Sequence, residues 1–233
     1  MKVMIWNIDC KKKSDKSKLW DYLDQELHPD ILLVQECKEY PSSYQGIGEH
    51  IGGTRLWGSM VLSKKYALEP IYIPKHLGWV VGAKLEIENY SLAIFSVHAK
   101  LIDIGRYVVP HLTQIFTDIM MAANDYQYLI IGGDLNASRR YDDVYSNPAQ
   151  YKHRNFFNWL ETDLHLVSAT GKEERQTMRG NSTHLYQNDH IYVSKNMREL
   201  LTNAQVLAND VISQVSDHNP VVAEFNLNDA LNK

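Results

Sequence analysis

The chain has 233 residues and a formal net charge of −4 at pH 7, which allows one well-buried domain and excludes a uniformly basic nucleic-acid coat. No apolar run reaches the ~18 residues of a membrane span, and the opening MKVMIWNIDC does not have the form of a secretory signal. The two cysteines, Cys10 and Cys37, are too few for a disulfide framework. We therefore expect a cytoplasmic protein with reduced thiols, in which residues 1–233 form a single domain.

In the first part of the chain, short apolar runs predict buried strands and one periodic segment predicts a helix. The runs VMIW, ILLV and SMVLS cover residues 3–6, 31–34 and 59–63. Residues 15–27 space Leu19 and Leu23 for one face of an amphipathic helix. The stretch GWVVGAKLEIENYSLAIFSVH, residues 78–98, predicts an antiparallel hairpin that turns at Glu88-Asn89.

The second part continues the same alternation of elements. Helices are predicted at 107–123 and at about 153–162, and strands at 128–133, 190–194 and 220–225. Strands such as LAIFSV (92–97) are apolar at successive positions, so both of their faces should be covered. The elements therefore predict an α/β sandwich of two mostly antiparallel sheets, face to face, with helices outside.

Polar residues recur where these predicted strands begin or end. A single polar residue at a strand end is usually a turn or capping residue. Here every such position carries an acid, an amide or a histidine, so we interpret the set as one site. Its members are Asn7, Asp9, Glu36, His98, Asp134, Asn136, Asp217 and His218.

With these residues in this order, the chain resembles the endonuclease/exonuclease/phosphatase superfamily. The similarity runs from WNID through QE, SVHAK, GGDLN and NDHIYVS to SDHNP. The resemblance implies a four-layer α/β sandwich, a phosphoesterase activity and a divalent metal. It also implies a role for each residue at a matching position.

By that resemblance, Glu36 is the principal metal ligand, with Asp9 and Asp217 beside it. Asn7 and Asn136 orient the nucleophile and the phosphate, and Asp134 positions or deprotonates the attacking water. His218 is the essential histidine, Asp189 is the carboxylate that orients it, and His98 contacts the phosphate. Sparse carboxylate sites of this kind suit Mg²⁺ or Mn²⁺ better than zinc.

Substrate-binding candidates come from position along the chain. Arg139 and Arg140 follow GDLNAS directly. The basic run at 11–18 could grip a phosphate backbone, but a solvated loop that enters a helix is the favoured interpretation of this run. Trp57, Trp79, Tyr141 and Tyr145 are candidates for base stacking, with packing as the alternative.

These observations favour a nuclease that acts on DNA, with no protein partner indicated. The alternatives are a phosphatase or phosphodiesterase for a small-molecule or lipid-headgroup phosphoester, and a non-catalytic binding module on the same fold. The family resemblance leaves this choice open, because His98 stands where apurinic/apyrimidinic endonucleases have Tyr, and QNDH stands where inositol phosphatases have WCDR.

Overall fold

The computed structural model describes residues 1–9, 16–51, 55–87, 90–101, 108–144, 152–179 and 184–227. Several expectations concern positions outside these described residues. They are Cys10, the first part of the basic run (11–15), the Glu88-Asn89 turn and Tyr145.

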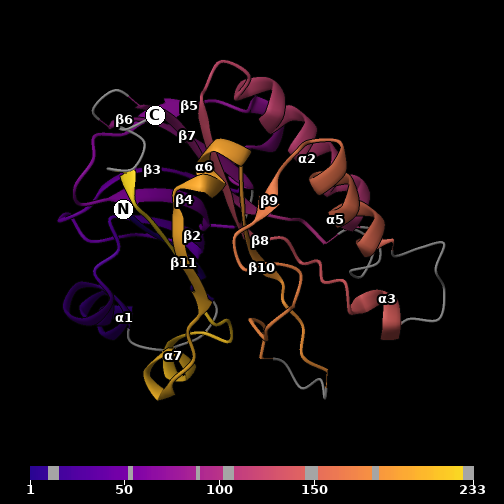
Figure 1. The fold of residues 1–233 in the computed structure, drawn as a ribbon. Helices are drawn as coiled ribbons and strands as arrows, with labels where there is room; N and C mark the ends of the chain where they lie inside the picture. Colours follow the sequence, from indigo (N-terminus) through magenta and orange to yellow (C-terminus); the bar gives the residue numbers. More distant parts are fainter. Residues whose placement is uncertain are drawn as a thin grey trace.

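Two six-stranded sheets form the centre of the molecule (Figure 1). The first has the order β11-β12-β1-β2-β4-β3 and the second the order β5-β6-β7-β8-β10-β9. The strands are β1 (Lys2–Asn7), β2 (Ile31–Cys37), β3 (Gln45–His50), β4 (Gly58–Ser63), β5 (Glu69–Ile71), β6 (Val80–Ile87), β7 (Tyr90–His98), β8 (Tyr128–Asp134), β9 (Val167–Ser168), β10 (Asp189–Val193), β11 (Leu201–Val206) and β12 (Val221–Phe225). In the described part of the chain, only β1 with β2 and β7 with β8 pair in parallel.

Helices cover the outer faces of both sheets. The helical segments of the described residues are α1 (Lys16–Tyr22), continued by a π-helical turn (Leu23–Leu27), a 3-10 turn (Pro74–His76), α2 (Val108–Ala122), α3 (Tyr141–Val144), α5 (His153–Thr162), α6 (Lys195–Glu199) and α7 (Asp210–Val215). Of these, α1 and α7 cover the first sheet and α2 and α5 cover the second. Figure 1 shows α2 and α5 on one side of the molecule and α1 and α7 on the opposite side.

Alternation along the strands builds the layers. Val3 and Ile5 of β1 belong to the apolar cluster between the sheets, whereas Met4 and Trp6 belong to the cluster with α1 and α7. A third cluster joins the outer face of the second sheet to α2 and α5, for example through Phe95. Three apolar layers between four layers of structure confirm the predicted sandwich.

The strands that the sequence did not predict are the four edge strands, β3, β5, β9 and β11. An edge strand needs apolar residues on only one face or on neither, so it lacks the continuous apolar run by which the central strands were recognised. In the burial pattern of β11, no residue is fully buried. Within the described residues, no helix is long and apolar enough to cross a membrane.

Candidate active site

A cavity of about 470 Å³ opens where the ends of central strands from both sheets meet. The structure brings together around it eight residues that the sequence singled out. They are Asn7, Asp9, Glu36, His98, Asp134, Asn136, Asp217 and His218. Asp189 lies behind the lining and is fully buried.

Strand register sets three of these groups side by side. His98 and Asp134 end the parallel strands β7 and β8 and are direct partners across them. Asp189 begins the antiparallel strand β10 and is the partner of Asp134 on its other side. Residues at one register position point to the same face of a sheet, so Asp134 lies between the other two.

The backbone around the site adopts conformations that L-residues seldom use. Asp9, Glu36 and Asn136 have φ values of 47°, 51° and 49°, and non-glycine residues in this left-handed region concentrate at functional sites. At Gly133 a Cβ atom would lie 1.9 Å from the Val97 carbonyl oxygen. A glycine there lets β8 approach β7 closely just before Asp134.

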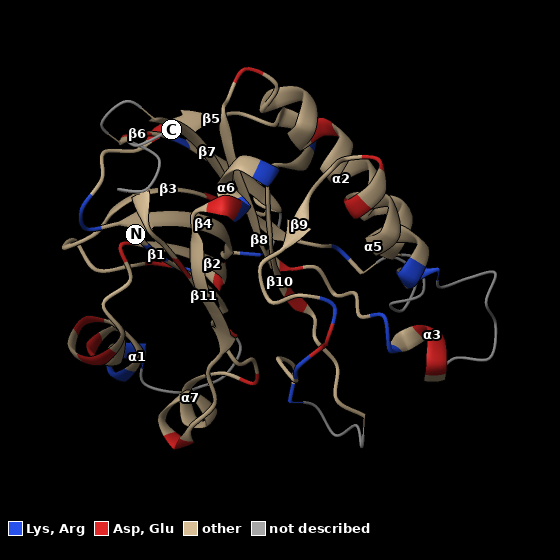
Figure 2. Cartoon of the chain, viewed as in Figure 1, with Lys and Arg blue, Asp and Glu red and all other residues tan. Residues whose placement is uncertain are grey.

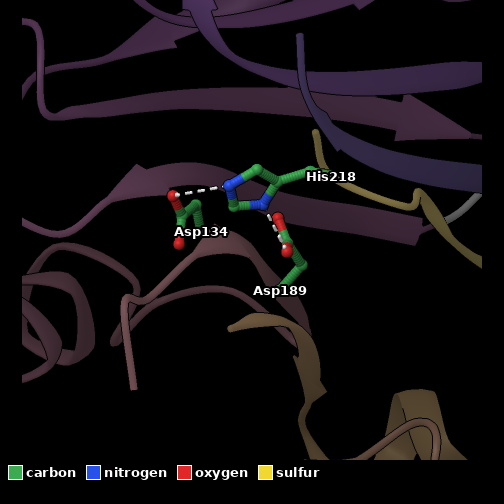
Figure 3. Close-up of side chains that lie close together, drawn as sticks. All are labelled: Asp134, Asp189 and His218. Atoms are coloured by element: carbon green, nitrogen blue, oxygen red, sulfur yellow. Dashed lines mark hydrogen bonds and ion pairs between the residues drawn. The ribbon is translucent and has the colours of Figure 1, made fainter. Parts of the chain in front are cut away.

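His218 and Asp189 form a buried hydrogen-bonded pair beside Asp134 (Figure 3). The distance from His218 Nδ1 to Asp189 Oδ2 is 2.8 Å, and His218 Nε2 lies 4.0 Å from Asp134 Oδ2. The backbone of His218 is fixed as well, because its N–H donates to Ser216 Oγ and its carbonyl accepts from the Trp6 indole. The imidazole therefore has a defined orientation, with Nε2 toward Asp134 and the cavity.

Asp134 is held by amides and faces a second histidine. Asn7 Nδ2 donates to Oδ2 at 3.0 Å, and the Asn136 backbone N–H donates to Oδ1 at 2.9 Å. His98 Nε2 lies 3.7 Å from Oδ2. Both carboxylate oxygens thus have fixed surroundings before any ligand arrives.

Burial and neighbouring charges act against each other on these two groups. Burial alone lowers the pKa of His218, but the carboxylates of Asp189 and Asp134 outweigh it and raise the pKa to about 10. Burial raises the pKa of Asp134, with a further contribution from Asp189, while the two histidines oppose the shift. His218 is therefore a cation at neutral pH.

Two groups of residues at the cavity contain atoms of the kind that bind metals. Ligand atoms of Asp134, Asp189 and His218 lie within 4.8 Å of one another. In this group the His218 Nδ1 is already hydrogen-bonded to Asp189, so Nε2 is the nitrogen of this imidazole that faces the cavity. Asp9, Glu36 and Asp217 line the same cavity and are partly exposed, and their hard oxygens fit a divalent cation such as Mg²⁺.

The loops that carry Asp9 and Asp217 are tied to the body of the protein by cations. Lys16 Nζ donates to the carbonyls of Ile8 and Asp9 at 2.6 and 3.0 Å. Arg179 donates from its guanidinium to the Ser216 carbonyl, and its backbone N–H donates to the Asp217 carbonyl at 2.8 Å. These bonds to main-chain atoms fix the loops from which the two carboxylates reach the cavity.

Arg139, a predicted substrate-binding residue, is not among the described residues that line the cavity. Its guanidinium pairs with Glu161 at 2.6 Å and lies over the Phe157 ring, 4.6 Å from the centroid. Arg140 is not among the described lining residues either. The reason is that the loop after Asn136 is drawn toward Glu174, which accepts the Arg139 backbone N–H at 2.6 Å.

The three stacking candidates within the described residues fall into two groups. Trp57 and Trp79 line the cavity. Tyr141 instead stacks on Tyr186 with ring centroids 4.2 Å apart. Stacking of Tyr141 on a neighbour agrees with the packing alternative.

The sequence interpretation missed two kinds of residue. Arg55 and Met178 line the cavity but lie outside the recognised motifs, and Lys100, the last residue of SVHAK, lines it without having been assigned a role. Thr177 is fully buried, and its Oγ1 accepts the backbone N–H groups of Asn188 and Asp189 at 2.9 and 3.0 Å. No local pattern marks Thr177, because its partners lie more than ten positions away along the chain.

Comparisons with known proteins agree with this architecture. A model of the Endonuclease/Exonuclease/phosphatase family matches residues 4–218. No curated protein sequence gives a match.

Solved structures share the fold at low sequence identity. The catalytic domain of Xenopus laevis APE2 is 16% identical with a TM-score of 0.72, covering 97% of this chain and 91% of that chain. An AP endonuclease from Archaeoglobus fulgidus is 16% identical with a TM-score of 0.69, covering 97% and 100%. The 3′ phosphatase NExo from Neisseria, bound to a product DNA hairpin, is 20% identical with a TM-score of 0.69, covering 97% and 99%.

Proposed function

The chain belongs to the endonuclease/exonuclease/phosphatase family, and from that premise we propose that it is a divalent-metal-dependent phosphodiesterase whose substrate is DNA. The observation that carries the proposal is the buried Asp189–His218 pair, whose imidazole faces Asp134 at the cavity. Hydrolysis of a phosphodiester needs a positioned water, a means of moving its proton, and positive charge at the phosphoryl oxygens.

Asp134 is the group proposed to position the water and accept its proton. Its two oxygens are held by Asn7 and Asn136, so a water bound to it has a fixed direction of approach. Its raised pKa makes it a better proton acceptor than an exposed aspartate. Asn7 and Asn136 also line the cavity, where amides can orient a phosphate.

His218 is proposed to supply charge at the phosphate. As a cation it donates through Nδ1 to Asp189 and presents Nε2 toward the cavity, where it can donate to a phosphoryl oxygen. His98, a buried residue that also lines the cavity, is proposed as a second donor to the phosphate. Held by Asp9, Glu36 and Asp217, Mg²⁺ or Mn²⁺ would supply Lewis-acid stabilisation of the developing negative charge.

DNA is favoured by the proteins of similar fold, two of which are named as an AP endonuclease and a phosphatase bound to DNA. A second candidate is a small-molecule or lipid-headgroup phosphoester. It is favoured by the small number of cations at the site, since Arg55 and Lys100 are the only Lys or Arg among the described lining residues. A non-catalytic module is the weakest alternative, because the polar groups the chemistry requires all meet at the cavity.

An activity screen with Mg²⁺ or Mn²⁺ tests the proposal on plasmid, single-stranded DNA, RNA, a dinucleotide and phosphomonoesters. A His218→Gln variant purified in parallel is the matched control for contaminating nucleases. We expect hydrolysis of DNA by the wild-type protein, no activity in EDTA, and little activity in the variant. Equal activity of the two proteins, or hydrolysis of phosphomonoesters alone, would contradict the proposal.

A further inference from the structure

One wall of the cavity is built from flat side chains that the mechanism above does not use. Trp57 precedes β4, Trp79 precedes β6, and both half-buried indoles line the cavity. Their ring centroids are 6.2 Å apart in an edge-to-face arrangement. His98 lies 5.5 Å from the Trp57 ring and 5.4 Å from the Trp79 ring, so the wall leads directly to the phosphate site.

Arg55 completes this wall on the solvent side. Its guanidinium carbon lies 5.5 Å from the Trp57 centroid and 5.4 Å from the Trp79 centroid, within the range of cation–π interaction. Arg55 is exposed, whereas His98 is 5% exposed. The order from solvent to floor is therefore a cation, two indoles, and an imidazole beside Asp134.

The wall is held in place by the fold. The Trp79 carbonyl accepts from the His98 backbone N–H at 2.7 Å and from Ser59 Oγ at 3.0 Å. The turn before Trp79 is fixed to α2, because Asp118 accepts from both Lys75 and His76 at 3.0 Å. An aromatic surface that is rigid before binding loses little entropy when a ring stacks on it.

We infer that Trp57 and Trp79 form a subsite for the base of an unpaired nucleotide that flanks the scissile phosphate, with Arg55 bound to the next phosphate. This inference rests on the proposed phosphodiesterase function and specifies its substrate as single-stranded or frayed DNA. Nucleobases stack on aromatic side chains irrespective of sequence. A guanidinium at the rim suits the neighbouring phosphate group.

The base has to be unpaired because both of its faces are covered inside a duplex. A base can reach a wall inside a cavity only after it leaves the stack, which costs least when it is already single-stranded. Duplex binding instead relies on many phosphate contacts. In Figure 2 the basic residues of the described chain are dispersed over several elements, and the chain has a net charge of −4.

The test compares a thymidine dinucleotide with two analogues in which an abasic sugar replaces the nucleoside on one side of the phosphate. Trp57→Ala and Trp79→Ala should raise KM for the dinucleotide by roughly 5- to 150-fold, the range for loss of one base–aromatic stack. The same variants should have little effect on the analogue that lacks the stacked base. Trp57→Phe should keep most of the affinity, and Trp159→Ala, on α5 and packed near Phe156, is the control for loss of an indole elsewhere.

Two further measurements keep the inference testable if an alanine variant does not fold. Quenching of wild-type indole fluorescence should be stronger with the dinucleotide than with the abasic analogue. The wild-type protein should also cleave a single strand with a higher kcat/KM than the same sequence in a duplex.

Hydrolysis of DNA with no effect of the base, or equal losses on the intact and abasic substrates, would overturn the subsite and leave the phosphodiesterase intact. Absence of any nucleic-acid hydrolysis would overturn both. Hydrolysis of phosphatidylcholine vesicles that depends on Trp57 and Trp79 would overturn the inference in favour of a lipid headgroup.

Discussion

The acidic residues at the cavity form two groups, a buried half and an open half, which differ in burial and in the bonds that position them. The buried half consists of Asp134, Asp189 and His218, whose side chains are 3%, 1% and 7% exposed. His218 lies 2.8 Å from Asp189 and 4.0 Å from Asp134. The open half consists of Asp9, Glu36 and Asp217, all partly exposed, with the Asp217 side chain 45% exposed. In the buried half the charges compensate one another, whereas the open half offers carboxylates to the cavity.

This difference indicates how each half is organised. In the buried half, side-chain hydrogen bonds fix the groups, and the cation of His218 makes the burial of two carboxylates tolerable. In the open half, the main chain positions the groups, through left-handed residues at Asp9 and Glu36 and through bonds from Lys16 and Arg179 to carbonyls. The open half therefore presents three carboxylates at the cavity, where the metal is proposed to bind.

The largest expected effect comes from breaking the buried half. Asp189→Asn should lower kcat about 10³- to 10⁴-fold, because the amide keeps the size of the carboxylate but no longer stabilises the imidazolium. The double variant Asp189→Asn with His218→Gln should be little worse than the poorer single variant, since residues that act as a unit are not additive. Steady-state kinetics on DNA compares the two single variants with the double variant. Full additivity of the losses in kcat would show that the two residues act separately.

An intermediate effect is expected from the open half. Loss of a residue that hydrogen-bonds to a metal ligand typically lowers activity by roughly 10- to 100-fold. Glu36→Gln changes a proposed ligand itself, so it should lower activity at low Mg²⁺ by at least this factor. Raising Mn²⁺ should recover part of the loss, because the defect is in metal binding. Rates measured across a metal titration would contradict the assignment if their metal dependence were the same as that of the wild type.

A smaller effect on activity should follow from Thr177→Val. This isosteric change removes the acceptor of two buried backbone N–H groups next to Asp189, so the free energy of unfolding should fall by about 1–3 kcal/mol. Displacement of Asp189 should lower kcat more than it raises KM. Denaturant unfolding and kinetics together check this, and an unchanged kcat would show that Thr177 has no influence on the catalytic pair.

Arg139→Ala should leave KM for DNA and its salt dependence unchanged, because the side chain pairs with Glu161 and lies outside the cavity lining. The free energy of unfolding should nevertheless fall by roughly 1–3 kcal/mol, since the paired guanidinium is mostly buried. The matched control is Arg154→Ala, whose pair with Asp143 is half exposed and should matter little. A flatter salt dependence of KM for Arg139→Ala would contradict this prediction and indicate that Arg139 contacts the substrate.

The sequence predicted the centre of the fold better than its edges. Central strands such as β7 and β8 are apolar on both faces and were recognised, and the polar residues at their ends led to Asp134 and His98. The edge strand β3 has a mixed burial pattern and was missed. Edge strands depend on backbone pairing with a neighbour, which no local pattern of residues records.

The site could be predicted to the same extent and for the same reason. Residues at strand ends converge because the sheets position them, so His98 and Asp134 were identified at the cavity from the sequence. The positions of Arg139 outside the cavity lining and of Arg55 within it could not be predicted, because the direction of a loop side chain depends on distant partners. These partners are Glu161 for Arg139 and two tryptophans for Arg55.

The most direct test of the difference between the two halves is to measure Mn²⁺ binding by electron paramagnetic resonance in the absence of substrate. Wild-type protein, Glu36→Gln and Asp189→Asn would be titrated in parallel. We expect Glu36→Gln to bind Mn²⁺ more weakly and Asp189→Asn to bind it as the wild type does. Loss of binding in Asp189→Asn with unchanged binding in Glu36→Gln would place the metal in the buried half and contradict the assignment.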